Sequence, residues 1–389
     1  MTKDILREIA IEYGTPTYVF DTDKLTHRVG EIKKIVGKKV QLCYAVKANP
    51  FLAVAMSEVV SRLEVCSPGE LSICQRLGID MDKVVLSGVN KTKKDVWQGV
   101  QNQVGTYTAE SIKHLDMINE AAIEQNKTFS VLLRLTSGNQ FGMDERAIKN
   151  IVKNKEGYKG VKLVGLHYFS GTQKKKTGEI EKELTYLDNF CDSLRDKMEF
   201  SVEKLEYGPG FSVPYFENDD FSDTLAPIKE LAPRLAELGA KYDFTIEMGR
   251  FFAAECGIYL SRVEDIKEND GINYCIIDGG INHISYYGQT LAMKIPKIQQ
   301  LKPPSNGGKK DYTICGSLCT TADVIVRKFP FASLEMGDII AFYNMGAYSV
   351  TEGIYLFLSR KMPRVVLYCE KTGGVLVRDY IETHTFNSL

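Results

Sequence analysis

The feature that most constrains the fold is a regular alternation of short β-rich runs and helical stretches between about residues 17 and 250. The β-rich runs are TYVFD, VQLCYAVKA, RLEVCS, KVVLSG, VGTYTAE, FSVLLRLT, KLVGLHYFSGT, KLEYGPG and FTIEMGR. Helical candidates between them are 53–63, 68–77, 110–125, 179–196 and 227–238. Repeated β–α units at this spacing imply parallel strands with crossover helices, and their number fits a closed (β/α)8 TIM barrel. A doubly wound open sheet is the alternative architecture.

After about residue 256 the helical pattern fades and strands dominate. The runs there are GIYLSRV, INYCIIDGG, DYTICGS, DVIVRKF, DIIAFYNMGAY, PRVVLYCE and GVLVRDY. A chain of 389 residues also exceeds the size at which a single core usually stops growing. We therefore predict a barrel over 22–255 and an antiparallel β-sandwich or β-barrel over 256–389, with 1–21 packing on the second domain.

Charge and composition argue against polyanion and membrane partners. The formal net charge is -1, and the 44% hydrophobic and 25% charged residues are ordinary for a globular protein. The amino terminus interleaves charged and apolar residues, and no later run reaches the roughly 18 apolar residues of a membrane span. We expect a cytoplasmic protein with no nucleic-acid or membrane partner. The nine cysteines lack the cluster that a zinc site needs, so we predict reduced thiols and no metal.

Three groups of residues stand at predicted strand ends, where parallel barrels carry their chemistry. Lys47 ends the apolar run LCYAV, where an ammonium must be paired, emerge at the barrel mouth or be used covalently. Gly208 and Gly210 in YGPGF would let backbone N–H groups approach an anion. Glu247 and Arg250 follow FTI, and suit a pyridine nitrogen and a phosphate or carboxylate, respectively. Taken alone, an exposed lysine, a tight turn and a local salt bridge would also explain these features.

A series of motifs along nearly the whole chain resembles one enzyme family. In order they are YGTPTYVFD, YAVKANP (44–50), EVCSPGEL (64–71), GLHYFSGTQ (165–173), YGPGF (207–211), EMGR (247–250), DGG (278–280), CTTAD (319–323) and GAY (346–348). They resemble the fold-type III pyridoxal-phosphate (PLP) decarboxylases, which include diaminopimelate and ornithine decarboxylases and are related in barrel to alanine racemase. The resemblance implies a barrel of the alanine racemase type and pyridoxal 5'-phosphate as the cofactor.

The resemblance also implies roles for individual residues. Lys47 resembles the Schiff-base lysine, and Glu247 resembles the acid that faces the pyridinium nitrogen. Cys319 resembles a cysteine that reaches in from a second subunit and returns a proton after carbon dioxide leaves, which implies a homodimer with shared active sites. A buried structural thiol would look the same in the sequence. The other cofactor contacts implied are Glu64, Glu70, Phe169, Thr172, Gly208, Gly210, Gly249, Arg250 and Tyr348, and the substrate contacts are His167, His283, Thr320 and Asp323.

Three departures from the family pattern bear on the substrate. Thr320 stands where diaminopimelate and ornithine decarboxylases carry an acid for the distal ammonium of the substrate. The segment INHISYYGQ (281–289) lacks the arginine that binds a distal carboxylate in diaminopimelate decarboxylases. Phe169 replaces the histidine that stacks on the cofactor ring, and His167 lies two residues earlier, on the same face of a strand.

Together the departures resemble a subgroup that acts on carrier-bound amino acids, the L-glutamyl-[acyl-carrier protein] decarboxylases. We therefore expect a PLP-dependent carboxy-lyase whose substrate is a carrier-bound or non-dibasic amino acid, such as an L-glutamyl thioester. The alternatives are a diaminopimelate decarboxylase of lysine biosynthesis, a non-catalytic PLP-binding relative, and a racemase on the same barrel. Release of carbon dioxide separates a decarboxylase from a racemase.

Overall fold

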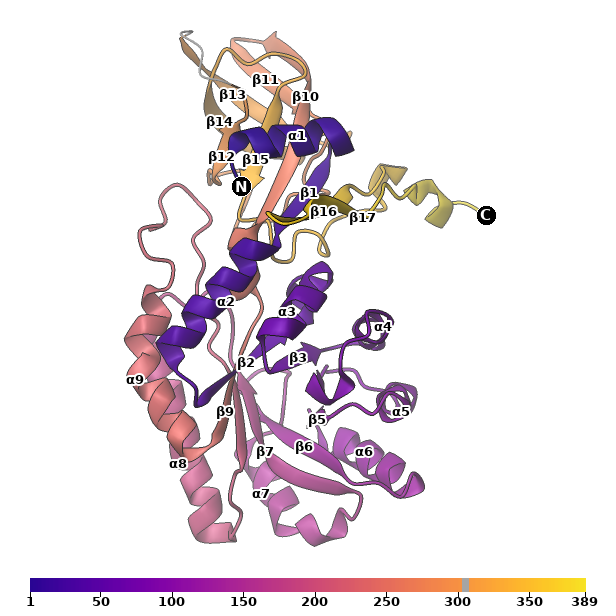
Figure 1. The fold of residues 1–389 in the computed structure, drawn as a ribbon, viewed down its shortest axis with the longest axis vertical. Helices are drawn as coiled ribbons and strands as arrows, with labels where there is room; N and C mark the ends of the chain where they lie inside the picture. The colour runs from indigo at the N-terminus through magenta and orange to yellow at the C-terminus, as the bar shows by residue number, and fades with distance from the viewer. Residues whose placement is uncertain (303–307) are drawn as a thin grey trace. The chain divides into compact units, whose positions relative to one another are not determined.

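The computed structural model describes residues 1–302 and 308–389, which divide into two compact units (Figure 1). The barrel unit comprises Thr26–Val213 and Asp223–Phe252. The β unit comprises Met1–Leu25, Pro214–Ser222 and Ala253–Leu389. The domain limits at 22–255 and 256–389 stay a prediction.

Eight parallel strands of the barrel unit form a closed barrel, which confirms the predicted TIM-type architecture and excludes an open sheet. Closure comes from the pairing of β2 with β9, in which Val40 lies opposite Phe244 and Cys43 opposite Glu247. Because all strands run in one direction, their carboxyl ends meet at a single mouth. The strands are β2 (Val40–Ala45), β3 (Arg62–Val65), β4 (Val84–Leu86), β5 (Thr106–Ala109), β6 (Phe129–Leu135), β7 (Val161–Phe169), β8 (Lys204–Gly208) and β9 (Asp243–Met248).

Four of the helices between these strands, α4 to α7, begin at residues whose side chains cap them, and each buries an apolar face. Ser67 caps α4 by accepting the N–H of Glu70, and Thr92 and Asp95 form a capping box at the start of α5. The helix predicted over 53–63 ends at Val59, because Val60 is extended and β3 begins at Arg62. The helices are α2 (Thr22–Val36), α3 (Ala53–Val59), α4 (Pro68–Arg76), α5 (Lys93–Gln101), α6 (Ile112–Glu124), α7 (Glu145–Lys153), α8 (Thr177–Met198), α9 (Ala226–Lys241) and α10 (Arg250–Ala253).

The β unit is built on one sheet with the strand order β14-β13-β11-β10-β1-β16-β17, while β15 pairs with β10 and β12. The predicted second β domain is therefore confirmed. Its sheet is mixed, because β1 pairs with β16 and β11 with β13 in parallel. These strands are far apart in the chain, so no tight hairpin forces an antiparallel pairing. The strands are β1 (Thr17–Asp21), β10 (Gly257–Asn269), β11 (Ile272–Ile277), β12 (Ile298–Gln300), β13 (Lys309–Cys315), β14 (Val324–Ala332), β15 (Ile339–Tyr343), β16 (Arg364–Cys369) and β17 (Gly373–Arg378).

Helix α1 (Lys3–Tyr13) packs on the sheet of the β unit. Its buried residues Leu6, Ile9 and Ala10 join a cluster with Val19 of β1 and Ile258 of β10, among other strand residues. Their spacing of three and one places them on one face of the helix. Among the described residues, no helix combines the length and apolarity needed to cross a membrane.

Candidate active site

The Lys47 amine lies between two buried carboxylates at the mouth of the barrel. Lys47 belongs to a short 3-10 turn, Val46–Ala48, which directly follows β2. Its Nζ atom is 2.6 Å from Oε2 of Glu64 and 3.6 Å from Oε1 of Glu247. These acids come from β3 and β9, the two strands that pair with β2. The lysine side chain is 38% exposed, so the amine is paired and still reachable from the mouth.

Glu247 is held from its other side by a buried histidine. Nε2 of His167, in β7, lies 2.9 Å from Oε2 of Glu247. Burial alone would raise the pKa of Glu247, but the charge of Lys47 and the hydrogen bond from His167 outweigh burial and lower this pKa. Glu247 therefore stays ionised at neutral pH. The sequence identified both residues, but it assigned His167 to the substrate and did not show its contact with Glu247.

The thiol of Cys66, which the sequence analysis did not identify, also lies beside the Lys47 amine. Sγ of Cys66 lies 3.0 Å from Oε1 of Glu64 and 3.5 Å from Nζ of Lys47. Burial raises the pKa of this thiol well above its usual value, so Cys66 is a neutral hydrogen-bond donor. The backbone N–H of Cys66 donates to Oε2 of Glu70 at 2.6 Å. Its place inside the EVCSPGEL motif was the only available signal.

The loops that follow β7 and β8 meet so closely that only glycine fits. Gly210 has a φ of +63°, and a Cβ on it would lie 1.9 Å from the carbonyl oxygen of Gly171 and 3.3 Å from Cα of Thr172. A Cβ on Gly208 would lie 2.5 Å from the ring of Phe169, its partner in register. The structure thus brings together four predicted cofactor contacts, in a cradle where backbone can approach an anion.

Two further predicted contacts lie beside the lysine turn. A Cβ on Gly249 would come within 2.8 Å of Cβ of Ala48, so the segment after β9 packs directly on the turn that carries Lys47. Arg250 follows as the first residue of α10 and is buried. PLP carries an aldehyde, a pyridine nitrogen and a phosphate. The Lys47 amine can bind the aldehyde, the Glu247 carboxylate can face the nitrogen, and the close-packed glycine cradle can receive the phosphate. The barrel-unit residues therefore fit PLP.

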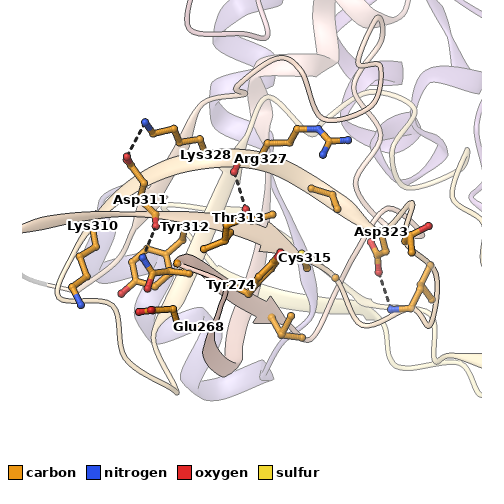
Figure 2. A pocket seen from close by; sticks show the side chains of 18 of the residues that line it. Glu268, Tyr274, Lys310, Asp311, Tyr312, Thr313, Cys315, Asp323, Arg327 and Lys328 are labelled. Atoms are coloured by element: carbon orange, nitrogen blue, oxygen red, sulfur yellow. Dashed lines mark hydrogen bonds and ion pairs between the residues drawn. The ribbon is translucent and has the colours of Figure 1, made fainter.

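The remaining predicted site residues belong to the β unit. Cys319 and Thr320 are exposed, and Tyr348 is half-buried with a φ of +69°. The carboxylate of Asp323 accepts the backbone N–H groups of Ile281 at 2.8 Å and Leu318 at 2.7 Å. Thr320 and Asp323 both line a pocket of about 1080 Å³ along β11, β13 and β14 (Figure 2).

His283 lies in the interior of the β unit. Its Nδ1 is 2.8 Å from the hydroxyl of Tyr259, and its Nε2 is 3.1 Å from Nδ2 of Asn282. Burial lowers the pKa of His283 to about 3, so this ring is neutral at physiological pH. Its predicted contact with substrate, like those of Thr320 and Asp323, stays a prediction.

Known proteins resemble this chain over almost its full length. Residues 22–254 match the family described as pyridoxal-dependent decarboxylase, pyridoxal binding domain. The chain is 25% identical over 381 residues to an L-glutamyl-[BtrI acyl-carrier protein] decarboxylase of Niallia circulans, covering 91% of this chain and 89% of that protein. It is 26% identical over 405 residues to the diaminopimelate decarboxylase of Methanocaldococcus jannaschii, covering 96% and 90%.

A crystal structure of diaminopimelate decarboxylase from M. jannaschii superposes with a TM-score of 0.86 at 26% identity, and the match covers 98% of this chain and 94% of that one. The family match and the named relatives are decarboxylases, and the placement of Lys47 and Glu247 at the barrel mouth fits the PLP dependence that the family model states. The chain belongs to the fold-type III pyridoxal-dependent decarboxylases, and it is a PLP-dependent carboxy-lyase.

Proposed function

We propose that this enzyme decarboxylates an amino acid without a free distal ammonium, such as an L-glutamyl group held as a thioester on a carrier protein. The observation that carries the proposal is Thr320, an exposed hydroxyl at the position where the family places an acid for a dibasic substrate. A neutral hydroxyl cannot compensate a desolvated ammonium, which is costly to bury unpaired. The similarity to the L-glutamyl carrier-protein decarboxylase supports the same choice.

The roles of the barrel residues follow from their positions. Bound PLP supplies an electron sink for the electron pair that departing carbon dioxide leaves behind. Lys47 would hold the cofactor covalently through its amine and would be the group that the substrate amine displaces, while Glu64, 2.6 Å from the Lys47 amine, would stabilise the positive charge on that nitrogen. Glu247, kept ionised, would accept a hydrogen bond from the protonated ring nitrogen and so keep that nitrogen protonated. The cradle of Thr172, Gly208 and Gly210, together with Arg250, would receive the phosphate, and Phe169 would lie against the cofactor ring.

A direct test compares substrates by the release of carbon dioxide. Holoenzyme is offered L-glutamyl thioester on a carrier protein, free glutamate, diaminopimelate, ornithine and lysine. The proposal expects turnover of the thioester and at least tenfold lower kcat/KM for each dibasic amino acid. Thr320→Asp is the matched variant, because it restores the family's acid and should raise activity on a dibasic substrate. Rapid turnover of diaminopimelate by the unchanged enzyme would overturn the proposal.

Diaminopimelate decarboxylation is the second candidate function. It is favoured by the 26% identity over 96% of this chain to the M. jannaschii enzyme, whose name states that activity. The same screen decides between the two, since this candidate requires diaminopimelate to be the best substrate.

We also propose that Cys319 returns the proton to the product, in a homodimer whose two active sites each use residues of both copies. Cys319 is exposed on the β unit, as a thiol offered to another chain must be. Cys319→Ala should retain bound cofactor and release carbon dioxide, but slow product formation or misdirect protonation. Mixing Lys47→Ala with Cys319→Ala subunits should restore activity at a mixed site. Unchanged turnover of Cys319→Ala, or no recovery on mixing, would refute these roles.

A further inference from the structure

One buried acid in the barrel has no role in the account above. Glu206, in the middle of β8, is 1% exposed. Neither of its carboxylate oxygens has a hydrogen-bond partner within the described part of the chain, and the nearest cation is Nη1 of Arg62 at 3.8 Å. A buried carboxyl group without hydrogen bonds destabilises a fold. Such a group is therefore a candidate for a functional constraint.

Glu206 lies next to the pair that faces the cofactor. It is opposite His167 of β7 and Thr245 of β9 in the barrel register. One potential ligand atom from each of His167, Glu206 and Glu247 lies within 4.8 Å of the other two. His167 is 2.9 Å from Glu247 and its Nδ1 has no direct partner among the described residues. The imidazole thus shares a buried space with two acids.

Ionisable side chains on β8 itself and on the other strands around Glu206 affect its charge. Burial is the main cause that raises the pKa of Glu206, to about 7, and the negative charges of Glu247 and Glu64 act in the same direction. His167 and Arg62 oppose this shift. The other ionisable neighbours are Cys43 on β2, Lys204 on β8 itself, and Asp243 on β9, which forms a 3.0 Å ion pair with Arg62. The thiol of Cys43 is neutral, because burial raises its pKa well above the usual value.

We propose that Glu206 is a positioning residue that acts through His167 on Glu247. When Glu206 is ionised, two negatively charged carboxylates, Glu206 and Glu247, face the His167 ring. When Glu206 takes up a proton, Glu247 is the one of these two acids that stays negatively charged. The proton exchanged on Glu206 comes from solvent, and no bond other than O–H is made or broken.

The protonation state of Glu206 therefore changes the strength of the hydrogen bond between His167 and Glu247. This inference rests on the proposed role of Glu247 toward the ring nitrogen of the cofactor. It adds Glu206, which is separated from that nitrogen by His167 and Glu247 and is not part of the family motifs.

The test is a pH series on holoenzyme carrying Glu206→Gln. Between about pH 6 and pH 9, the unchanged enzyme should show a transition near pH 7 in kcat and in the absorbance of bound PLP. Glu206→Gln should lose this transition and change kcat by on the order of tenfold, with KM and cofactor content kept within about twofold. Glu206→Asp, which keeps an ionisable group, should retain a transition.

Cys43→Ala is the matched control, because Cys43 is a buried, neutral neighbour that lies in register with both Glu247 and Arg62. It should lower stability and keep the transition. A transition that persists in Glu206→Gln, or that is lost equally in Cys43→Ala, would overturn the role of Glu206. If borohydride fixes no cofactor on Lys47 of the unchanged enzyme, the proposed function fails instead, so the two failures are distinguishable.

Discussion

Replacing Glu206 with glutamine should stabilise the cofactor-free protein, and only at high pH. The pKa of Glu206 is raised from 4.5 to about 7 in the folded state, mainly by burial. The folded protein therefore binds this proton more tightly than the unfolded chain, and stability falls as pH rises from about 4.5 through about 7. One pKa unit corresponds to about 1.4 kcal/mol, so ionised Glu206 costs about 3 kcal/mol at pH 8. Glutamine cannot ionise and escapes this cost.

Urea unfolding followed by tryptophan fluorescence measures the effect. Trp97 is the only tryptophan of the chain and lies in α5 of the barrel unit, so its signal reports on the unit that contains Glu206. Other buried groups, such as His114 with a pKa lowered to about 4 by burial, titrate alike in both proteins and cancel in the difference. The free energy of unfolding of the variant should exceed that of the unchanged protein by about 3 kcal/mol at pH 8, and by about zero near pH 4.5. A variant that is less stable than the unchanged protein at pH 8 would show that Arg62 and His167 stabilise the Glu206 carboxylate, and would contradict the predicted cost of ionising it.

Two further substitutions test the packing around the predicted site residues. Gly210→Ala should lower the free energy of unfolding by about 1–2 kcal/mol because of its positive φ, and further because the added Cβ would lie 1.9 Å from the carbonyl oxygen of Gly171. The variant should no longer retain the cofactor in gel filtration. Gly78→Ala is its control, because Gly78 has a φ of +68° and a Cβ added there would meet no atom within 4 Å, so only the backbone cost should appear in urea unfolding. Asp323→Ala should remove the acceptor of the N–H groups of Ile281 and Leu318, which should lower the free energy of unfolding by about 1–3 kcal/mol for each group. Hydrogen exchange at those two amides should accelerate. Unchanged exchange there would show that Asp323 does not organise this loop.

The barrel and much of its mouth could be predicted because both depend on local patterns. Alternating β and α segments identify parallel strands, and parallel strands bring residues at their ends together, which is why the sequence alone points to Lys47 and Glu247, whose charged atoms lie 3.6 Å apart. The two parallel pairings of the β unit were missed, since they join strands far apart in the chain. Hydrophobic pattern does not report which distant strands become neighbours.

The contacts behind the lysine could not be predicted for the same reason. His167 and Glu247 are separated by 80 residues, and only closure and register of the barrel set their 2.9 Å approach. Glu206 had a signal that was overlooked: it shares strand parity with Gly208, so a charged side chain stands on the same face as a predicted cofactor contact. That its carboxylate meets no hydrogen-bond partner in the part of the chain that the structure describes is a property of three-dimensional packing, which the sequence does not reveal.

We expect Lys47 to hold the cofactor covalently at the barrel mouth. Holoenzyme is reduced with borohydride, digested and analysed by mass spectrometry, beside Lys47→Ala and Lys91→Ala. Lys91 is the matched control, a buried lysine of the barrel unit whose pKa is lowered to about 8 by burial. The phosphopyridoxyl mass should appear on the peptide containing Lys47, persist in Lys91→Ala and vanish in Lys47→Ala. A label on any other lysine, or none at all, would contradict the account.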